Sequence, residues 1–192
     1  MPMRYVGIDP ATRTGYVALD QDGNLLRAKE ITGAGYTSVR KIRSLANEIF
    51  QHLQPLDVVG IEGFALNARD TNKVSSGNGW AARMAVDRAG LIYMEPTPSQ
   101  LKKFVNVSEW TGVKGSKKRL DGKTVKKLVI ESVHEHWGFK AATDNIADAF
   151  VLAKITEAVH KVKNGYRIEK YPDYQQEVIM AILHPEKKKK RA

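Results

Sequence analysis

The sequence contains no cysteine. Disulfide bonds, thiolate catalysis and zinc sites with cysteine ligands are therefore excluded. It also lacks an apolar run long enough to cross a membrane. The charged residues Asp9, Arg13 and Asp20 interrupt the apolar stretch near the N-terminus, a pattern unlike that of a signal peptide. These absences predict a cytoplasmic protein with no membrane partner.

Acidic residues are scarce relative to basic ones. The chain has 21 Asp and Glu against 31 Lys and Arg, a net charge of +10. Residues 187–191 supply five of these positive charges, and +5 remains on the rest of the chain. A body this basic favours a polyanionic partner such as nucleic acid.

The 192 residues suffice for one domain with a sizeable core. Apolar runs bounded by turn residues predict strands at 5–9, 14–19, 25–31, 57–62 and 91–95. Apolar residues spaced three and four apart predict helices at 38–53, 80–89, 99–106, 124–137, 144–162 and 175–183. Residues 63–79 and 107–121 are expected to be polar loops. The strand–helix–strand order implies a parallel pair beside an antiparallel meander. The prediction is an α/β domain with a five-stranded mixed sheet flanked by helices.

Carboxylates stand at the ends of two predicted strands and at the start of the last long helix. Asp9 ends the first strand and Glu62 the fourth, while Asp144 and Asp148 share one helix face. Three of the four have a simpler interpretation: Asp9 can cap a turn, and the helical pair can be a solvated first turn. Neighbouring strands lie about 5 Å apart, however, so the four acids can converge. Converging carboxylates in a basic protein predict a site for two Mg²⁺ ions that hydrolyses phosphodiesters.

Short motifs at these positions carry a family resemblance. They are Gly7-Ile-Asp9-Pro with Gly15, Ile61-Glu62, Pro98-Ser-Gln-Leu-Lys-Lys103, Gly122-Lys123 and Ala147-Asp148-Ala149. In this order they resemble the RuvC-type Holliday-junction resolvases of the ribonuclease H superfamily, over residues 3–163. The resemblance implies a ribonuclease H-like nuclease domain at 1–163 and a C-terminal extension with a basic tail at 164–192. It also implies a homodimer that cuts opposing strands of a four-way DNA junction symmetrically, with Mg²⁺ or Mn²⁺. A bacterial and a viral origin both fit.

The resemblance assigns the acids residue by residue. Asp9, Glu62 and Asp148 match the acids that bind two metal ions in the family. The bacterial pattern places another acid or a histidine three residues before the last Asp, where this chain has Asn145. Asp144, four residues before, resembles the spacing of mitochondrial and some viral members. Asp144 is therefore the preferred fourth ligand and Asn145 the alternate.

The resemblance also implies roles for three other side chains. Lys102 and Lys123 fall where the family carries basic residues that face the scissile phosphate. Phe64, shortly after Glu62, resembles the aromatic residue at the junction centre, although its offset differs. A core phenylalanine that closes the fourth strand is an equal alternative for Phe64.

The segment 101–127 is unusually basic, with nine Lys and Arg against two acids. Such a density suits contacts to DNA phosphates, although a solvated face is an alternative. Trp110 in this segment either stacks on a base or packs in the protein. The predicted DNA-binding residues besides Phe64 are Lys103, Lys114, Lys117, Lys118, Arg119, Lys126 and Lys127.

Three functions remain open from the sequence. The preferred one is a metal-dependent endonuclease that resolves four-way DNA junctions. A nuclease of the same fold that acts on an RNA–DNA hybrid or a flap is the enzymatic alternative. A junction-binding protein without catalysis is the third, and the departure at Asn145 keeps it open, since a weakened metal site could leave binding without turnover.

Overall fold

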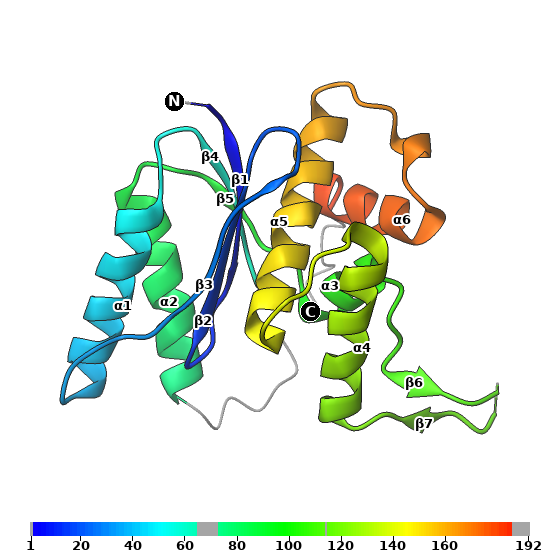
Figure 1. Ribbon diagram of the computed structural model, residues 1–192, viewed down its shortest axis with the longest axis horizontal. Helices are drawn as coiled ribbons and strands as arrows, with labels where there is room; N and C mark the ends of the chain where they lie inside the picture. Colours follow the sequence, from blue (N-terminus) through cyan, green and yellow to red (C-terminus); the bar gives the residue numbers. More distant parts are fainter. Residues whose placement is uncertain (1, 65–72, 114, 186–192) are drawn as a thin grey trace, which may run out of the picture.

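A five-stranded mixed sheet forms the centre of the molecule (Figure 1). The computed structural model describes residues 2–64, 73–113 and 115–185. The strands are β1 (Arg4–Asp9), β2 (Thr14–Leu19), β3 (Leu25–Ile31), β4 (Asp57–Ile61) and β5 (Tyr93–Met94), in the order β3-β2-β1-β4-β5. β1 pairs antiparallel with β2, and β2 with β3, whereas β4 lies parallel to both β1 and β5. The predicted α/β fold with a mixed sheet is confirmed.

Helices cover both faces of this sheet (Figure 1). The first face carries α1 (Ser38–His52) and α2 (Lys73–Arg88). The second carries α5 (Asp144–Lys163), with α3 (Pro98–Phe104), α4 (Gly122–Trp137) and α6 (Asp173–Leu183) packed outside it. A short 3₁₀ turn, Ile168–Lys170, connects α5 to α6.

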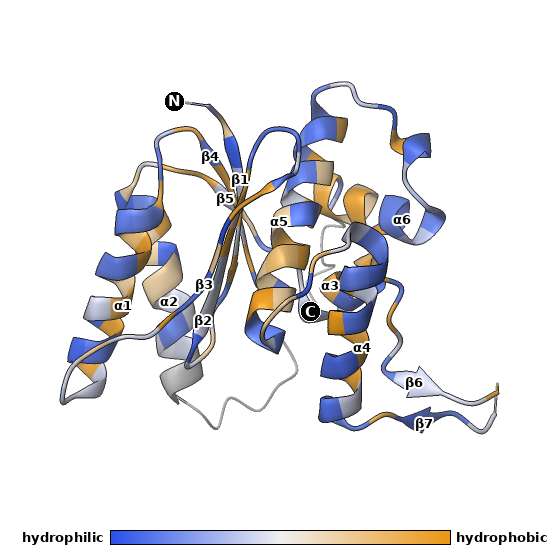
Figure 2. Cartoon of the chain, viewed as in Figure 1, coloured by the Kyte–Doolittle hydropathy of each residue, from blue (hydrophilic) through white to orange (hydrophobic). Residues whose placement is uncertain are grey.

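Two hydrophobic clusters follow from the alternation of side chains along the strands. Every residue of β1 and β2 is buried, because helices cover both faces of these strands. Val6 and Ile8 join the cluster under α1 and α2, whereas Tyr5 joins the cluster under α5. The apolar residues of the helices turn toward these clusters (Figure 2). Helix α5 is buried on several sides, because it lies between the sheet and the outer helices.

Two glycines let α5 lie directly on the sheet. A Cβ atom on Gly7 would lie 2.0 Å from the carbonyl oxygen of Ala149, and one on Gly15 would lie 2.0 Å from that of Asn145. Any larger residue at these positions would push the helix outward. The close approach fixes the first turns of α5 over the ends of β1 and β2.

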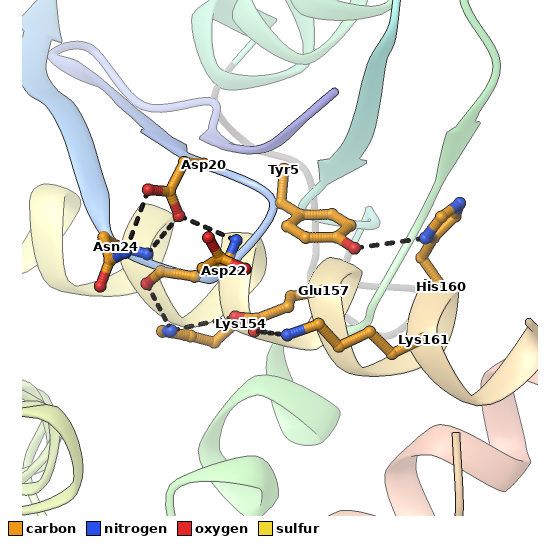
Figure 3. Close-up of polar contacts among 9 residues, drawn as sticks. Tyr5, Asp20, Asp22, Asn24, Lys154, Glu157, His160 and Lys161 are labelled. Atoms are coloured by element: carbon orange, nitrogen blue, oxygen red, sulfur yellow. Dashed lines mark hydrogen bonds and ion pairs between the residues drawn. The ribbon is translucent and has the colours of Figure 1, made fainter. Parts of the chain in front are cut away.

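A polar network ties α5 to the other end of the sheet (Figure 3). Lys154 Nζ donates to the carbonyl oxygen of Gly23 in the β2–β3 turn at 2.8 Å and to Glu157 at 2.9 Å. Lys161 also donates to Glu157, at 2.6 Å. Two lysines therefore share one carboxylate that is mostly shielded from solvent.

The structure differs from the sequence prediction in two segments. Helix α2 begins at Lys73, within the expected loop 63–79. The expected loop 107–121 contains a two-stranded ribbon of β6 (Trp110–Thr111) and β7 (Lys118–Arg119), which extends away from the helices (Figure 1). In the described part of the chain, no helix has the length and apolarity needed to cross a membrane.

Candidate active site

The ends of β1 and β4 bring two carboxylates together. The backbone N–H of Glu62 donates to the carbonyl oxygen of Ile8 at 3.0 Å, so the parallel pairing continues to the residue beside Asp9. Asp9 is buried, with 7% of its surface exposed. The two acids that the sequence places at strand ends are therefore neighbours at one edge of the sheet.

Helix α5 brings the other two acids to the same edge. Its N-cap is Thr143, whose side chain accepts from the N–H of Ile146 at 3.3 Å. Asp144 occupies the first turn and Asp148 the second, four residues further on. Because Gly7 and Gly15 hold this end of α5 against β1 and β2, Asp148 lies close enough to raise the pKa of both Asp9 and Glu62.

The three inner acids, Asp9, Glu62 and Asp148, have raised pKa values. Burial, and then the negative charge of Asp148, raise the pKa of Glu62 to about 7, against the smaller opposing effects of Lys102 and of a hydrogen bond with Asp9. Burial, and then Asp144, raise the pKa of Asp148 to about 6. The pKa of Asp9 is raised well above its usual value, chiefly by burial and by Glu62. Carboxylates that are buried and repel one another fit a site for a multivalent cation.

The acids do not form a ready-made coordination shell. Among the residues that the structure describes, no three acidic or imidazole side chains lie close enough to hold one ion as they stand. Oxygen donors are nevertheless the ligands that Mg²⁺ prefers. Asp9, Glu62 and Asp148 are therefore the residues that could hold a divalent metal, whose positive charge would offset their mutual repulsion.

The two candidates for a fourth ligand have different partners. Asp144 pairs with Lys126 of α4, which lowers the pKa of Asp144. The side-chain amide of Asn145 donates to Glu30 of β3 at 2.9 Å. Asp144 also raises the pKa of Asp9 and of Asp148. Asp144 therefore acts electrostatically on the inner acids, whereas the Asn145 amide is engaged at the neighbouring strand.

Lys102 approaches the acids from α3. This helix begins with a capping box, in which Thr97 and Gln100 bond each other's backbone N–H groups, and Pro98 occupies its first turn. The charge of Lys102 lowers the pKa of both Glu62 and Asp148. Its Nζ is also 2.9 Å from a carboxylate oxygen of Glu109, which lies just before the ribbon.

The two lysines near the start of α4 occupy different surroundings. Lys123 is exposed, and its backbone N–H binds the N-cap Asp121. Lys126, one turn later, pairs with Asp144 and lines the cavity beside the acids. Both lysines are exposed, and Lys126 is the one that pairs with an acid of the site.

A cavity of about 390 Å³ opens beside the acids. Its charged lining comes from the end of β4, from α3, α4 and α5, and from the ribbon, and its floor includes Leu101, Val125 and Val129. The charged residues that line it are Glu62, Lys102, Glu109, Arg119, Lys126 and Asp148. The cavity therefore has acidic side chains, which suit a metal cation, and basic side chains, which suit a phosphate bound to that cation.

Phe64 lies at the surface, with 39% of its area exposed. The guanidinium of Arg83 lies 4.0 Å from the centre of its ring, and the ring of Trp80 lies 5.6 Å away. Arg83 is itself fixed by Glu95, at 2.9 Å and 2.5 Å. Phe64 is therefore not a core residue, and it forms an exposed aromatic pair with Trp80.

The other predicted DNA-binding residues that the structure describes are exposed, and Arg119 among them lines the cavity. Lys118 and Arg119 belong to the ribbon and Lys117 directly precedes β7, whereas Lys127 pairs with Glu131 on α4 at 3.5 Å. Lys103 pairs with Glu177 of α6. Lys114 lies outside the described residues.

Sequence reasoning missed Glu109 and the position of Lys126 near the acids. Both depend on contacts between distant segments, and no local pattern reports them. The spacing of Lys126 three residues after Lys123 shows only that both can lie on neighbouring parts of one helix.

Solved structures share this architecture. A Thermus thermophilus RuvC in complex with a Holliday junction substrate superposes with a TM-score of 0.61 and 16% sequence identity, over 85% of this chain and 96% of that chain. The chain has a RuvC-like fold. A second Thermus thermophilus RuvC structure gives a TM-score of 0.58 and 18% identity, over 86% and 97% of the two chains. No family model and no curated protein matches the sequence.

The RuvC-like fold confirms the resemblance in architecture that the motifs indicated. At this level of identity it establishes the fold alone.

Proposed function

We propose that the protein is a metal-dependent endonuclease that resolves four-way DNA junctions by phosphodiester hydrolysis. The observation that carries the proposal is the group of buried, mutually repelling carboxylates Asp9, Glu62 and Asp148, beside a cavity lined with Lys102 and Lys126. The RuvC-like fold supports a branched DNA as the substrate, since one of the solved neighbours is a complex with a Holliday junction substrate.

The inner acids would hold two Mg²⁺ or Mn²⁺ ions, with Asp144 as the fourth ligand. When bound, the metal ions supply a water of lowered pKa and stabilise negative charge on the leaving oxygen. Side chains of the protein would supply the other contacts. Lys102 is placed to bind the scissile phosphate once it leaves Glu109. Lys126 is placed to balance the charge of Asp144 in the DNA-free protein.

The basic surface around the cavity would bind the arms of the junction. Lys123 and Lys127 at the start of α4, Lys118 of the ribbon and Lys117 just before it are exposed and suited to phosphate contacts. Lys103 would join them after exchange of its partner Glu177. Phe64, with Trp80, offers an exposed aromatic surface for the unpaired centre of the junction.

We propose further that two copies act together and that residues 1–163 form the nuclease unit. One chain has one group of inner acids, whereas resolution requires two cuts in opposing strands. Residues 164–192 would be an extension, whose helix α6 packs on α3 and α5. Sedimentation of the free protein and of its junction complex would measure the number of copies, and a single copy in the complex would contradict this part.

A junction-binding protein without catalysis is the second candidate. The observation that favours it is that no three acids in the described residues stand ready to coordinate one ion. It predicts tight binding of the junction and no product with any divalent metal.

Cleavage assays separate these functions. A labelled immobile junction, a linear duplex, an RNA–DNA hybrid and a flap would be incubated with Mg²⁺, Mn²⁺ or EDTA. Paired cuts confined to the junction, lost in EDTA and in Asp148→Asn, are expected. Equal cleavage of unbranched substrates would replace the proposed specificity. Binding without cleavage would favour the second candidate. Asp87→Asn, at an exposed position of α2, is the matched control for Asp148→Asn.

A further inference from the structure

The ribbon of β6 and β7 presents an aromatic and a cationic side chain side by side. Trp110 pairs with Arg119, and Thr111 pairs with Lys118. Residues directly opposite each other in an antiparallel pair have side chains on the same face. Trp110 and Arg119 therefore share one face, and Thr111 and Lys118 share the other.

Trp110 lies outside the hydrophobic core of the described part of the chain. It belongs to neither hydrophobic cluster of those residues, makes no ring contact with another of their aromatic side chains, and has 52% of its area exposed. Its backbone is nevertheless held. The hydroxyl of Ser108 accepts from its N–H at 3.0 Å and donates to its carbonyl oxygen at 2.9 Å. A fixed backbone with an exposed indole is suited to binding a flat partner.

The base of the ribbon connects this face to the cavity beside the acids. The N–H of Leu120 donates to the carbonyl oxygen of Glu109 at 2.8 Å, so the ladder continues for one more pair. Arg119, Leu120 and Glu109 all line the cavity. The carboxylate of Glu109 lies 2.9 Å from Lys102 and 3.7 Å from Arg119.

This carboxylate lies between two cationic side chains in the lining of the cavity. A DNA phosphate carries the same charge and the same kind of oxygen acceptors, so it can replace Glu109 between Lys102 and Arg119. Arg119 shares its face of the ribbon with Trp110, so a phosphate bound to Arg119 would bring its own nucleotide to that face. Indole rings stack on bases of any sequence, and a base can stack on one only when it has left its own helix.

We propose that Trp110 and Arg119 form a nucleotide-binding face, which holds one unstacked base and its phosphate beside the cavity. This inference rests on the proposed function and assigns to it a contact on the strand that enters the site. Arg119 binds the phosphate, Trp110 stacks on the base, and Glu109 occupies the phosphate position in the DNA-free protein.

The test uses junctions that carry a fluorescent purine analogue at one position near the crossover, scanned position by position. Binding would be measured in EDTA, without cleavage, for the full-length wild type and for Trp110→Ala, Trp110→Phe and Thr111→Ala. Thr111 is the matched control, because it lies on the opposite face of the same strand. The wild type is expected to change the fluorescence at one position, since stacking on indole alters the emission.

Trp110→Ala is expected to lose that signal and to bind on the order of tenfold more weakly. Trp110→Phe should keep most of both, and Thr111→Ala should match the wild type. Arg119→Ala should lower the slope of log affinity against log salt by about 1. Thermal melts of each variant would confirm that the fold is retained.

The outcomes distinguish this inference from the proposed function. If the wild type binds and cleaves junctions while Trp110→Ala gives the same signal and affinity, only the nucleotide-binding face is overturned. If the wild type does not bind junctions, both proposals fall together. A loss of signal in Thr111→Ala equal to that in Trp110→Ala would show a general effect of the ribbon and would also contradict the inference.

Discussion

Asp148 is the residue at which the electrostatics of the site meet. It raises the pKa of Asp9 and of Glu62, and its own pKa is raised by burial and by Asp144. An asparagine at this position keeps the shape and removes the charge. Asp148→Asn is expected to reduce junction cleavage by about 100-fold or more, since substitutions of residues that only support metal ligands already cost 10–100-fold. Retained cleavage would remove Asp148 from the site, and binding in EDTA should be unchanged.

The raised pKa values also predict how stability depends on pH in the metal-free protein. The carboxyl groups of Glu62 and Asp148 titrate near pH 7 and pH 6 in the folded state and near pH 4 when unfolded. Between these values the folded state binds more protons, so the free energy of unfolding falls as pH rises through this window. For Asp148 the loss is on the order of 3 kcal/mol at neutral pH.

Calorimetry in EDTA at pH 5.5 and 7.5 would measure this effect. The histidines His52 and His160 act in the opposite direction, because burial lowers their pKa. The comparison is therefore between the wild type and Asp148→Asn. The variant is expected to be the more stable protein at pH 7.5, with a smaller difference at pH 5.5, and a variant that is less stable at both would contradict the assignment.

At the scale of elements, the position of α5 depends on two glycines. A Cβ on Gly7 would meet the backbone of Ala149 at 2.0 Å and that of Ala153 at 2.5 Å, and neither can move without the helix. Gly7→Ala is therefore expected to cost about 3 kcal/mol in urea unfolding. Gly122→Ala is the matched control, because a Cβ there meets nothing within 4 Å, and it should be neutral or slightly stabilising. Equal effects would contradict the close docking of α5.

The lysine pair on Glu157 anchors the other end of α5 (Figure 3). Lys154 and Glu157 each expose 12% of their side chains, so removal of the carboxylate charge leaves two poorly solvated cations together. Glu157→Gln is expected to lower the free energy of unfolding by about 2 kcal/mol. The exposed pair of Lys127 and Glu131 is the control, and Glu131→Gln should change stability by less than about 0.5 kcal/mol. Chemical denaturation of both variants would test the difference.

The strands and most helices could be predicted because their signals are local. The start of α2 could not, because its sequence is rich in Ser, Gly and Asn, which favour loops. Tertiary contacts override this preference. The amide of Asn78 donates to the carbonyl oxygen of Ala11 at 2.9 Å, and Gly77 lets α2 approach Ile42 of α1. The ribbon strands have two residues each, too few for any periodicity.

The part of the candidate site that depends on local patterns could also be predicted from the sequence. Pairing of neighbouring strands was enough to expect Asp9 beside Glu62, and helical spacing was enough to put Asp144 and Asp148 on one face. Which lysine of α4 reaches the acids depends on the rotation of that helix about its axis. The sequence does not report this rotation, and so Lys126 was expected only at the DNA surface.

At the scale of the whole molecule, the excess of positive charge is the feature that most affects DNA binding. The chain carries +10, of which residues 187–191 contribute five charges. Deletion of residues 187–192 is expected to weaken binding to junctions and to linear duplexes alike, and to reduce the salt dependence of both. The cleavage pattern should not change, because contacts between these charges and DNA phosphates do not distinguish a junction from a linear duplex. Titrations at several salt concentrations would test this, and a loss confined to junctions would contradict it.

The two glycines beneath α5 also limit which substitutions such a sequence can accept during evolution. The helix carries Asp148, the strand carries Asp9, and the distance between them is set by atoms of the main chain that touch across the absent side chains. Most of the core can be exchanged for other apolar residues without altering that distance. A remote relative with the same arrangement is therefore expected to keep a glycine two residues before its first acid and a small residue directly after its last, even where little else can be aligned.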